Sequence, residues 1–167
     1  MKSKSRASLI CVVLLLTTSF VHAATPDHPD FSGSYSLKSV KGEDKPDRDE
    51  TWTVQITQSE TEIKIVTSLN GHPSVEVFAL NGSESKCHNA DGDEAKCTAS
   101  WNGKTLTLET IYTAHPTENS PDVEMHNRER LELSNAGKTL TIRSDQKAPR
   151  YPYLQISEPT TEIYTRD

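Results

Sequence analysis

Basic residues, aromatic residues and cysteines are all scarce in this chain of 167 residues. There are 18 Lys and Arg against 24 Asp and Glu, which gives a formal net charge of −6. Recognition of phosphate backbones and anionic lipid depends on clustered Lys and Arg, and the only concentration of them is at the N-terminus. The composition therefore argues against a nucleic-acid-binding or lipid-surface protein, and the acidic charge fits a soluble chain.

Signatures of catalysis and of metal binding are also missing. The sequence contains no Gly-x-Ser-x-Gly, no His-Glu-x-x-His and no Cys-x-x-Cys motif. Four of its histidines, His72, His88, His115 and His126, are scattered without a ligand spacing. We therefore expect no catalytic residue, no cofactor and no metal site, and the chain is not predicted to be an enzyme.

Long apolar runs are absent, and the longest one lies close to the N-terminus. Leu9 to Leu16 is too short for a membrane span, which needs ~20 apolar residues. It follows the basic residues Lys2, Lys4 and Arg6 and precedes Val21-His22-Ala23. This order of a basic, an apolar and a small-residue segment is typical of a secretory signal peptide.

We therefore expect residues 1–23 to be a cleaved signal peptide and residues 24–167 to form a single domain. Cleavage would remove three basic residues and no acidic ones, so the formal net charge would change from −6 to −9. The exported protein would be periplasmic or extracellular, would have no membrane span, and is expected to be a monomer.

Only two of the three cysteines, Cys87 and Cys97, would remain after cleavage. Thiols of exported proteins meet oxidising conditions and commonly pair. Between them, Asp91-Gly92-Asp93 has strong turn chemistry, and a hairpin folded about Gly92 would place Cys87 opposite Cys97. We expect a structural disulfide; a calcium or zinc loop is the alternative, but its ligand spacing is absent.

No helical period of useful length occurs, whereas alternation of apolar and polar residues recurs along the chain. Trp52, Val54 and Ile56, for example, alternate with polar residues. The strands predicted in this way are 31–37, 51–57, 62–69, 75–80, 95–101, 104–112, 128–134, 138–142 and 160–167. Predicted loops fall at 41–50, 113–122 and 144–153. Eight or nine strands joined mostly by short turns predict an all-β, antiparallel barrel or sandwich.

Four short motifs occur in an order that resembles the secreted bacterial lipocalin-like family of small β-barrel domains. They are Phe31-Ser32-Gly33-Ser34-Tyr35, the segment from Trp101 to Leu106, the segment from Glu129 to Thr141, and Tyr164-Thr165-Arg166. The resemblance implies a calycin-type, up-and-down antiparallel barrel. Tyr35 stands where the first strand of such domains usually has Trp, and the cysteine pair is not general in the family.

The resemblance implies a binding module that holds a small hydrophobic ligand inside the barrel, because a barrel of about eight strands has room for one small ligand. The candidate interior residues are Tyr35, Trp52, Trp101, Tyr112 and Arg143, the last beside Glu129. The alternative is a solid interior in which the aromatic side chains fill the core. In either case Tyr35, Trp52 and Trp101 are predicted to be buried.

A second hypothesis is an interaction protein of the cell envelope, such as an inhibitor of a secreted enzyme. The acidic loops 41–50 and 91–94 could be presented to a basic partner from a rigid scaffold, although charged loops are more often simply solvated. The sequence identifies neither a ligand nor a protein partner.

Overall fold

The computed structural model describes residues 28–42, 50–89, 92–115, 121–151 and 158–167. The expected signal peptide, residues 1–23, and most of the predicted loop 41–50 lie outside the described residues. Within the described part, no helix is long and apolar enough to pass through a bilayer.

Ten antiparallel strands make up the described part of the chain, one or two more than the sequence predicts. They are β1 (Gly33–Lys41), β2 (Trp52–Gln58), β3 (Glu62–Leu69), β4 (His72–Ala79), β5 (Ser85–His88), β6 (Glu94–Asn102), β7 (Thr105–Ala114), β8 (Val123–Ser134), β9 (Thr139–Lys147) and β10 (Thr160–Arg166). All belong to one sheet, in the order β4-β3-β2-β1-β10-β9-β8-β7-β6-β5.

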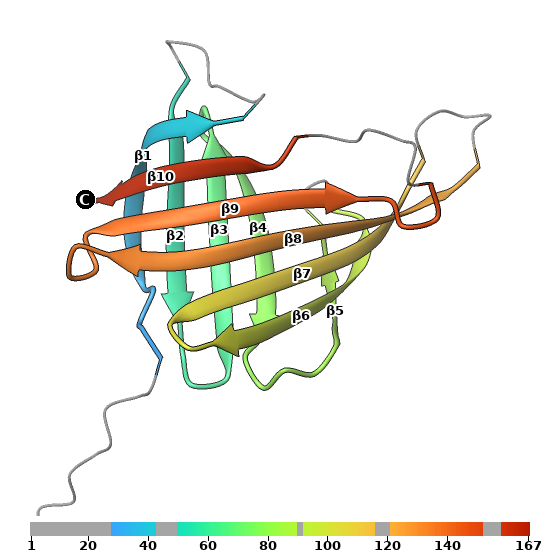
Figure 1. Cartoon of the computed structure of the whole chain (residues 1–167), viewed down its shortest axis with the longest axis horizontal. Helices are drawn as coiled ribbons and strands as arrows, with labels where there is room; N and C mark the ends of the chain where they lie inside the picture. Colours follow the sequence, from blue (N-terminus) through green and yellow to red (C-terminus); the bar gives the residue numbers. More distant parts are fainter. Residues whose placement is uncertain (1–27, 43–49, 90–91, 116–120, 152–157) are drawn as a thin grey trace, which may run out of the picture.

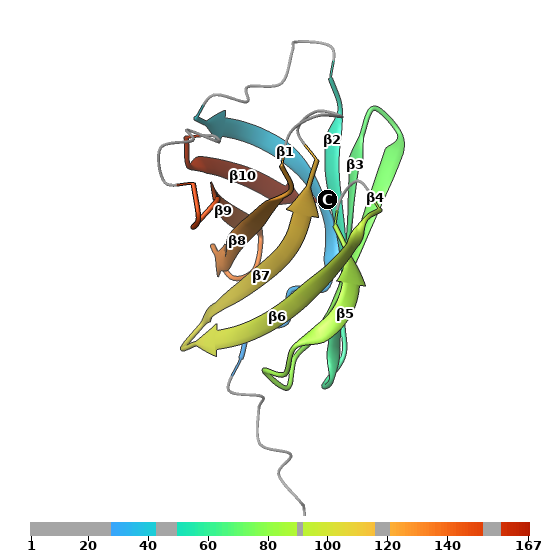
Figure 2. The ribbon, with the colours of Figure 1, turned by 90° about the vertical axis from the view of Figure 1, so that its right-hand side faces the viewer.

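This order makes a nearly closed up-and-down barrel, in which consecutive strands are neighbours in the sheet except for β4 and β5, and β1 pairs with β10. Strands β2 to β4 form one layer and cross β6 to β10, which form the other (Figure 1). The register shifts between Leu37 and Ser39 in β1, where such an irregularity lets a strand bend from one layer into the other. Strands β4 and β5 end the sheet and lie beside each other (Figure 2).

The first and last strands are tied together near one end of the barrel. Arg166 donates a hydrogen bond from Nη2 to the Tyr35 hydroxyl at 2.6 Å, and its guanidinium lies 5.1 Å from the centre of the Tyr35 ring. The same side chain passes over Gly33, where an added Cβ would come within 3.1 Å of Arg166 Nε. Tyr35 in turn donates to the Phe31 carbonyl at 2.7 Å, so one buried unit joins the chain's first and last strands.

Two predicted hairpins are present, one of them with a different register. Asn70 and Gly71 both have positive φ and form the two-residue turn between β3 and β4, as their sequence predicts. Cys87 and Cys97 form the expected disulfide. They are not directly opposite, however: Cys87 pairs with Ala95 and His88 with Glu94, so the bridge runs diagonally with a Cα–Cα distance of 5.8 Å.

Several strand boundaries were predicted wrongly, always at the same end of the barrel. β8 begins at Val123 rather than at residue 128, and β9 continues to Lys147 through residues predicted as a loop. The added portions have inward-facing polar residues such as Asn127, Ser144 and Gln146, which line the interior. Polar residues at inward positions break the apolar alternation, and for this reason the sequence pattern predicts β8 and β9 to be shorter than they are.

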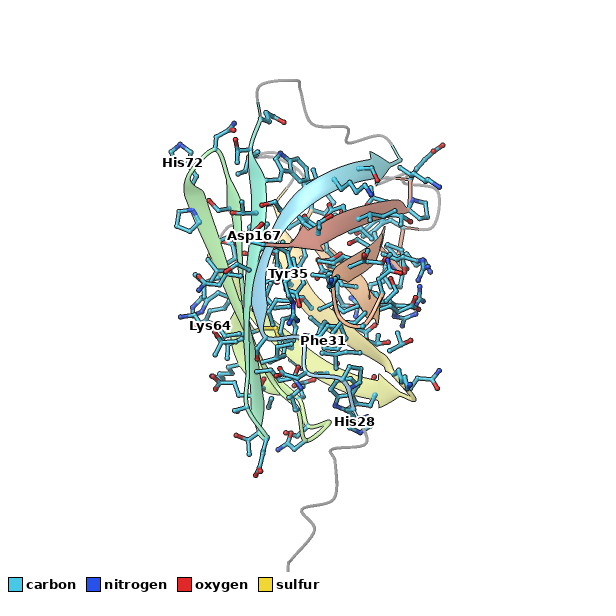
Figure 3. The ribbon with its side chains drawn as sticks, turned by 90° about the vertical axis from the view of Figure 1, so that its left-hand side faces the viewer. His28, Phe31, Tyr35, Lys64, His72 and Asp167 are labelled. Carbon is cyan, nitrogen blue, oxygen red and sulfur yellow. A yellow bond between two sulfur atoms is a disulfide. The ribbon has the colours of Figure 1, made fainter. Side chains whose placement is uncertain are left out.

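One main core fills the other end of the barrel. Its fully buried side chains include Phe31, Tyr35, Leu106, Leu131 and Tyr164. Figure 3 shows Phe31 and Tyr35 between the two layers, with Lys64 on the outer face of β3. The burial of Tyr35 is confirmed. The prediction that Trp52 and Trp101 are buried is wrong, because both are only half-buried near the ends of their strands.

Candidate functional site: a polar cavity inside the barrel

The inward-facing side chains change from apolar to polar at the same level on neighbouring strands. On β7, Leu106 and Leu108 are followed by Thr110 and Tyr112. The inward residues of other strands change in the same way, from Leu131 to Glu129 and Asn127, from Ile142 to Ser144 and Gln146, from Tyr164 to Glu162, and from Phe78 to Glu76. The barrel interior therefore has an apolar half and a polar half.

The polar half contains a cavity of about 320 Å³. Its walls come from β2, β3, β4, β7, β8, β9 and β10, together with Asn89 after β5. The lining residues are Val54, Ile65, Thr67, Ser74, Glu76, Asn89, Thr110, Tyr112, Asn127, Glu129, Ile142, Ser144, Gln146, Glu162 and Tyr164. Its volume is at the lower end of the range typical of small-molecule sites, about 300–1,000 Å³.

Three carboxyl groups enter this cavity from three strands. Glu76 comes from β4, Glu129 from β8 and Glu162 from β10. Tyr164 donates a hydrogen bond to Glu162 at 2.7 Å. Glu76 is hydrogen-bonded to the buried Thr110 side chain, and the Glu129 side chain is hydrogen-bonded to that of Asn127 on the same strand.

The environment disfavours ionisation of Glu129 and Glu76. Burial raises the pKa of Glu129 to about 8, and repulsion from Glu76 and Glu162 adds to the effect. Burial also raises the pKa of Glu76, against the lowering effect of its hydrogen bond to Thr110. The pKa of Tyr164 is raised by burial and by the neighbouring carboxylates, so its hydroxyl stays protonated and donates to Glu162. At neutral pH Glu129 is mostly protonated.

A small apolar cluster lies beyond the carboxyl groups, toward the far ends of β7 and β8. Val123, Met125 and Ala148 are buried there, with Tyr112 and Tyr151 packed against them. Gln146 donates a hydrogen bond to the Tyr112 hydroxyl at 2.6 Å, which joins this cluster to the cavity wall. The polar cavity is thus bounded by apolar side chains on both sides along the barrel.

The opposite end of the barrel is closed by the segment that precedes β1. The His28 ring stacks on Trp101 with centroids 4.2 Å apart and planes only 4° from parallel, and His28 Nδ1 donates to the Gly103 carbonyl at 3.2 Å. Phe31 also contacts Trp101, with ring centroids 6.0 Å apart. Trp101 therefore belongs to the cover of the apolar end.

Of the five residues predicted from the sequence to face a ligand, Tyr112 lines the cavity. Tyr35 and Trp101 belong to the apolar end, and Trp52 hydrogen-bonds through Nε1 to Glu50 at 3.3 Å near a strand end. None of these three lines the cavity.

Arg143 does not face the interior, and this prediction is corrected. It is exposed on the outer side of β9, next to the inward-facing Ile142 and Ser144, and forms an ion pair with Glu132 at 2.9 Å. The alternation of the strand is the reason, because neighbouring residues point to opposite faces. Glu129 does point inward as the sequence suggested, but its interior neighbours are the carboxyl groups of Glu76 and Glu162.

Sequence reasoning missed Glu76 and Glu162. Each occupies the inward position on its strand two residues from a buried aromatic side chain, Phe78 and Tyr164 respectively. A search for charged residues on the otherwise apolar face of each predicted strand would have found both of them.

The described residues offer neither a metal site nor a basic group inside the cavity. No group of His, Cys, Asp and Glu in the described ranges is arranged to hold a metal ion. None of the described residues that line the cavity is His, Cys, Lys or Arg. The chemistry that these walls supply is therefore hydrogen bonding by hydroxyl, amide and carboxyl groups, and attraction of positive charge.

Searches against protein-family models and against curated proteins found no match for this chain. Solved structures do match its fold. One is described as the fatty acid transporter REP1-NXSQ, with 17% identity, a TM-score of 0.56, and coverage of 82% of this chain and 96% of that one. Another is the zebrafish ileal bile acid-binding protein in complex with cholic acid, with 19% identity, a TM-score of 0.57, and coverage of 82% and 98%.

The fold is that of a calycin-type β-barrel. At these identities the likeness concerns the path of the chain and not the lining of the barrel. The calycin-type barrel described here therefore has the architecture of the two ligand-binding proteins, while the chemistry of its interior has to be read from its own residues.

Proposed function

We propose that this calycin-type barrel is an exported binding protein that holds one small, partly hydrophobic ligand in its interior cavity. The observation that carries the proposal is the 320 Å³ cavity, which has polar groups in its wall and apolar side chains at both ends. A concave site of this volume, in which convergent polar groups adjoin apolar side chains, suits a small molecule. The fold likeness to a fatty acid transporter and a bile acid-binding protein supports it.

Export is part of the same proposal. The segment order of residues 1–23 and the disulfide between Cys87 and Cys97 both fit an oxidising compartment. N-terminal sequencing of the protein recovered from its own host tests it. A mature chain that starts near Ala24 is expected, and recovered material that still begins at Met1 would contradict export.

Binding in the cavity is tested by native mass spectrometry of the purified protein, first for a co-purified small molecule and then with added ligands. A phenylalanine at Ser144 would occupy part of the cavity, whereas a phenylalanine at the neighbouring, outward-facing Arg143 would not. Ser144→Phe should weaken ligand binding at least tenfold, and Arg143→Phe should leave it unchanged. Equal binding by the two variants, both shown to be folded, would place the ligand elsewhere.

Protein binding is a second candidate function, favoured by the surface at the ends of the sheet. Val75 and Val77 on β4 are 44% and 36% exposed and line a groove between β4 and β5. Strands at the ends of a sheet are able to accept a further strand. Of the acidic loops proposed for this role, residues 43–49 and 90–91 lie outside the described residues. Size-exclusion chromatography that shows a stable complex, lost on Val77→Lys, would favour this candidate.

A further inference from the structure

The electric charge of the cavity distinguishes among the ligands that the proposed function allows. Three of its described lining residues are glutamates, and none is Lys or Arg. The arginines of β8 and β9 lie on the outer surface instead, where Arg128 pairs with Glu109 and Arg130 with Asp145. A carboxylate ligand would therefore enter a space that contains three acidic side chains and no described cation, where nothing compensates its negative charge.

The shape of the site adds a second requirement. A volume of about 320 Å³ equals roughly ten water molecules at ~30 Å³ each, so it suits a ligand of about ten non-hydrogen atoms. Apolar side chains lie on both sides of the carboxyl groups, with Ile142 and Val54 toward the closed end and Met125 and Val123 in the cluster at the other end. The occupant should therefore carry a polar group joined to an apolar part.

Resting on the proposed function, we propose that the ligand is a small amphipathic amine whose cationic nitrogen lies among Glu76, Glu129 and Glu162. A protonated amine donates hydrogen bonds to carboxylates and supplies the positive charge that the described lining lacks. Its hydrocarbon part would pack on the apolar walls. The cavity is thereby selective against fatty acids, although the barrel shares its fold with a fatty acid transporter.

Binding of a cation should release a proton from the site. Glu129, with its pKa raised to about 8, is mostly protonated at pH 7 in the free protein, and a cation beside it favours the ionised form. The titratable groups that face Glu129 are Glu76 from β4 and Glu162 and Tyr164 from β10. The affinity for a ligand of fixed positive charge should therefore rise between pH 6 and pH 9.

The test compares eight-carbon ligands that differ in the head group: octylamine, octyltrimethylammonium, 1-octanol and octanoate. Isothermal titration calorimetry at pH 7 should give octylamine an affinity at least tenfold higher than octanoate, with 1-octanol between them. Octyltrimethylammonium, whose charge does not titrate, reports the pH dependence of the protein alone. The heat of binding in buffers of different ionisation enthalpy gives the number of protons released.

Variants assign the selectivity to the carboxyl groups. The double variant Glu76→Gln and Glu129→Gln should reduce the preference for octylamine over octanoate to less than threefold and should leave the affinity for 1-octanol unchanged. Glu132→Gln is the matched control, because Glu132 is on β8 but points outward to Arg143. It should keep the full preference. The unchanged affinity for 1-octanol shows that the cavity is intact in each variant.

Two failures are distinguishable. If octanoate binds as tightly as octylamine or more tightly, the amine inference is overturned while the proposed binding function stands. If none of the four ligands binds at millimolar concentration, and Ser144→Phe does not reduce the binding of any co-purified small molecule, the proposed function is overturned as well. A preference for octylamine that survives loss of Glu76 and Glu129 would also refute the role of these carboxyl groups.

Discussion

The two halves of the barrel interior are formed by the same strands, but one is a packed core and the other contains a cavity. In the apolar half, Leu106, Leu131 and Tyr164 are fully buried in a continuous core. Two to four residues away on the same strands, Thr110, Glu129 and Glu162 line a cavity. The comparison teaches that stability and a candidate binding site are separated along the barrel axis, because hydrophobic burial in one half offsets the cost of buried carboxyl groups in the other.

The largest expected effect sharpens this contrast on a single strand. Leu131→Ala removes a fully buried side chain in the apolar half and should lower the free energy of unfolding by about 2–5 kcal/mol. Asn127→Ala is on the same strand and the same face but lines the cavity, and it should cost about 1 kcal/mol through loss of the hydrogen bond to Glu129. Urea unfolding measures both. Equal losses would mean that the two halves are not different in packing.

The disulfide lies at the boundary between the halves, since Cys97 Sγ is 3.7 Å from Thr110 Oγ1. β5 pairs only with β6 among the described strands, and the bridge adds a covalent link between these two strands. Replacing both cysteines by alanine should lower the free energy of unfolding by roughly 2–3 kcal/mol and accelerate amide exchange in β5. Wild-type protein in reducing agent should behave in the same way. Two free thiols in the untreated protein would contradict the bridge.

The polar half should make stability depend on pH. The pKa of Glu129 in the folded protein, about 8, is above its ordinary value of 4.5, so the folded state binds this proton more tightly than the unfolded state. Its contribution to stability is therefore full below about pH 4.5 and is lost as pH rises toward 8.

Glu129→Gln removes that titration. The variant should be more stable than the wild type by about 1–3 kcal/mol at pH 8 and equal to it near pH 4. Urea unfolding at pH 4, 6 and 8 gives the comparison, with the outward-facing Glu132→Gln as control. A wild-type protein whose stability does not fall between pH 5 and pH 8 would contradict the raised pKa.

The smallest effect concerns the cover of the apolar end. His28→Ala removes the ring stacked on Trp101 and should cost about 0.5–1 kcal/mol. Iodide should then quench Trp101 fluorescence more strongly, measured in a Trp52→Phe background so that one tryptophan reports. Affinity for a cavity ligand should not change, because neither His28 nor Trp101 lines the cavity. A weakened affinity would show that the two halves are coupled.

Much of the fold was predictable because alternation is a local property of the sequence. Segments such as 51–57 and 62–69 placed β2 and β3 correctly within one residue, and Asn70-Gly71 marked the turn after β3. The cysteine pair was predictable from the compartment that the N-terminal segment suggests. The register of the Cys87 hairpin was not, because the length of a turn shifts the partner of each following residue.

The candidate site was less predictable, for a reason that lies in the same residues. Ser144 and Gln146 fall in the segment 144–153 that its prolines predicted to be a loop, yet they continue β9 along the cavity wall. Arg143 was placed inside because it is near Glu129 in the pattern of strands, yet it is one residue out of phase with the inward face. A polar inward position and the end of a strand have the same appearance in a sequence.

By itself the sequence determined that the chain forms antiparallel strands with one apolar face, and that one hairpin carries a cysteine pair. Only the tertiary structure decided that Glu76, Glu129 and Glu162 share one cavity, since they come from β4, β8 and β10, far apart in the chain. Pairing of β1 with β10 joins β1 to β4 with β5 to β10 in one sheet, and the curvature of that sheet into a nearly closed barrel brings these side chains together. Local alternation fixes the face on which a residue lies, whereas the neighbours it meets across the barrel depend on the register of every strand between them.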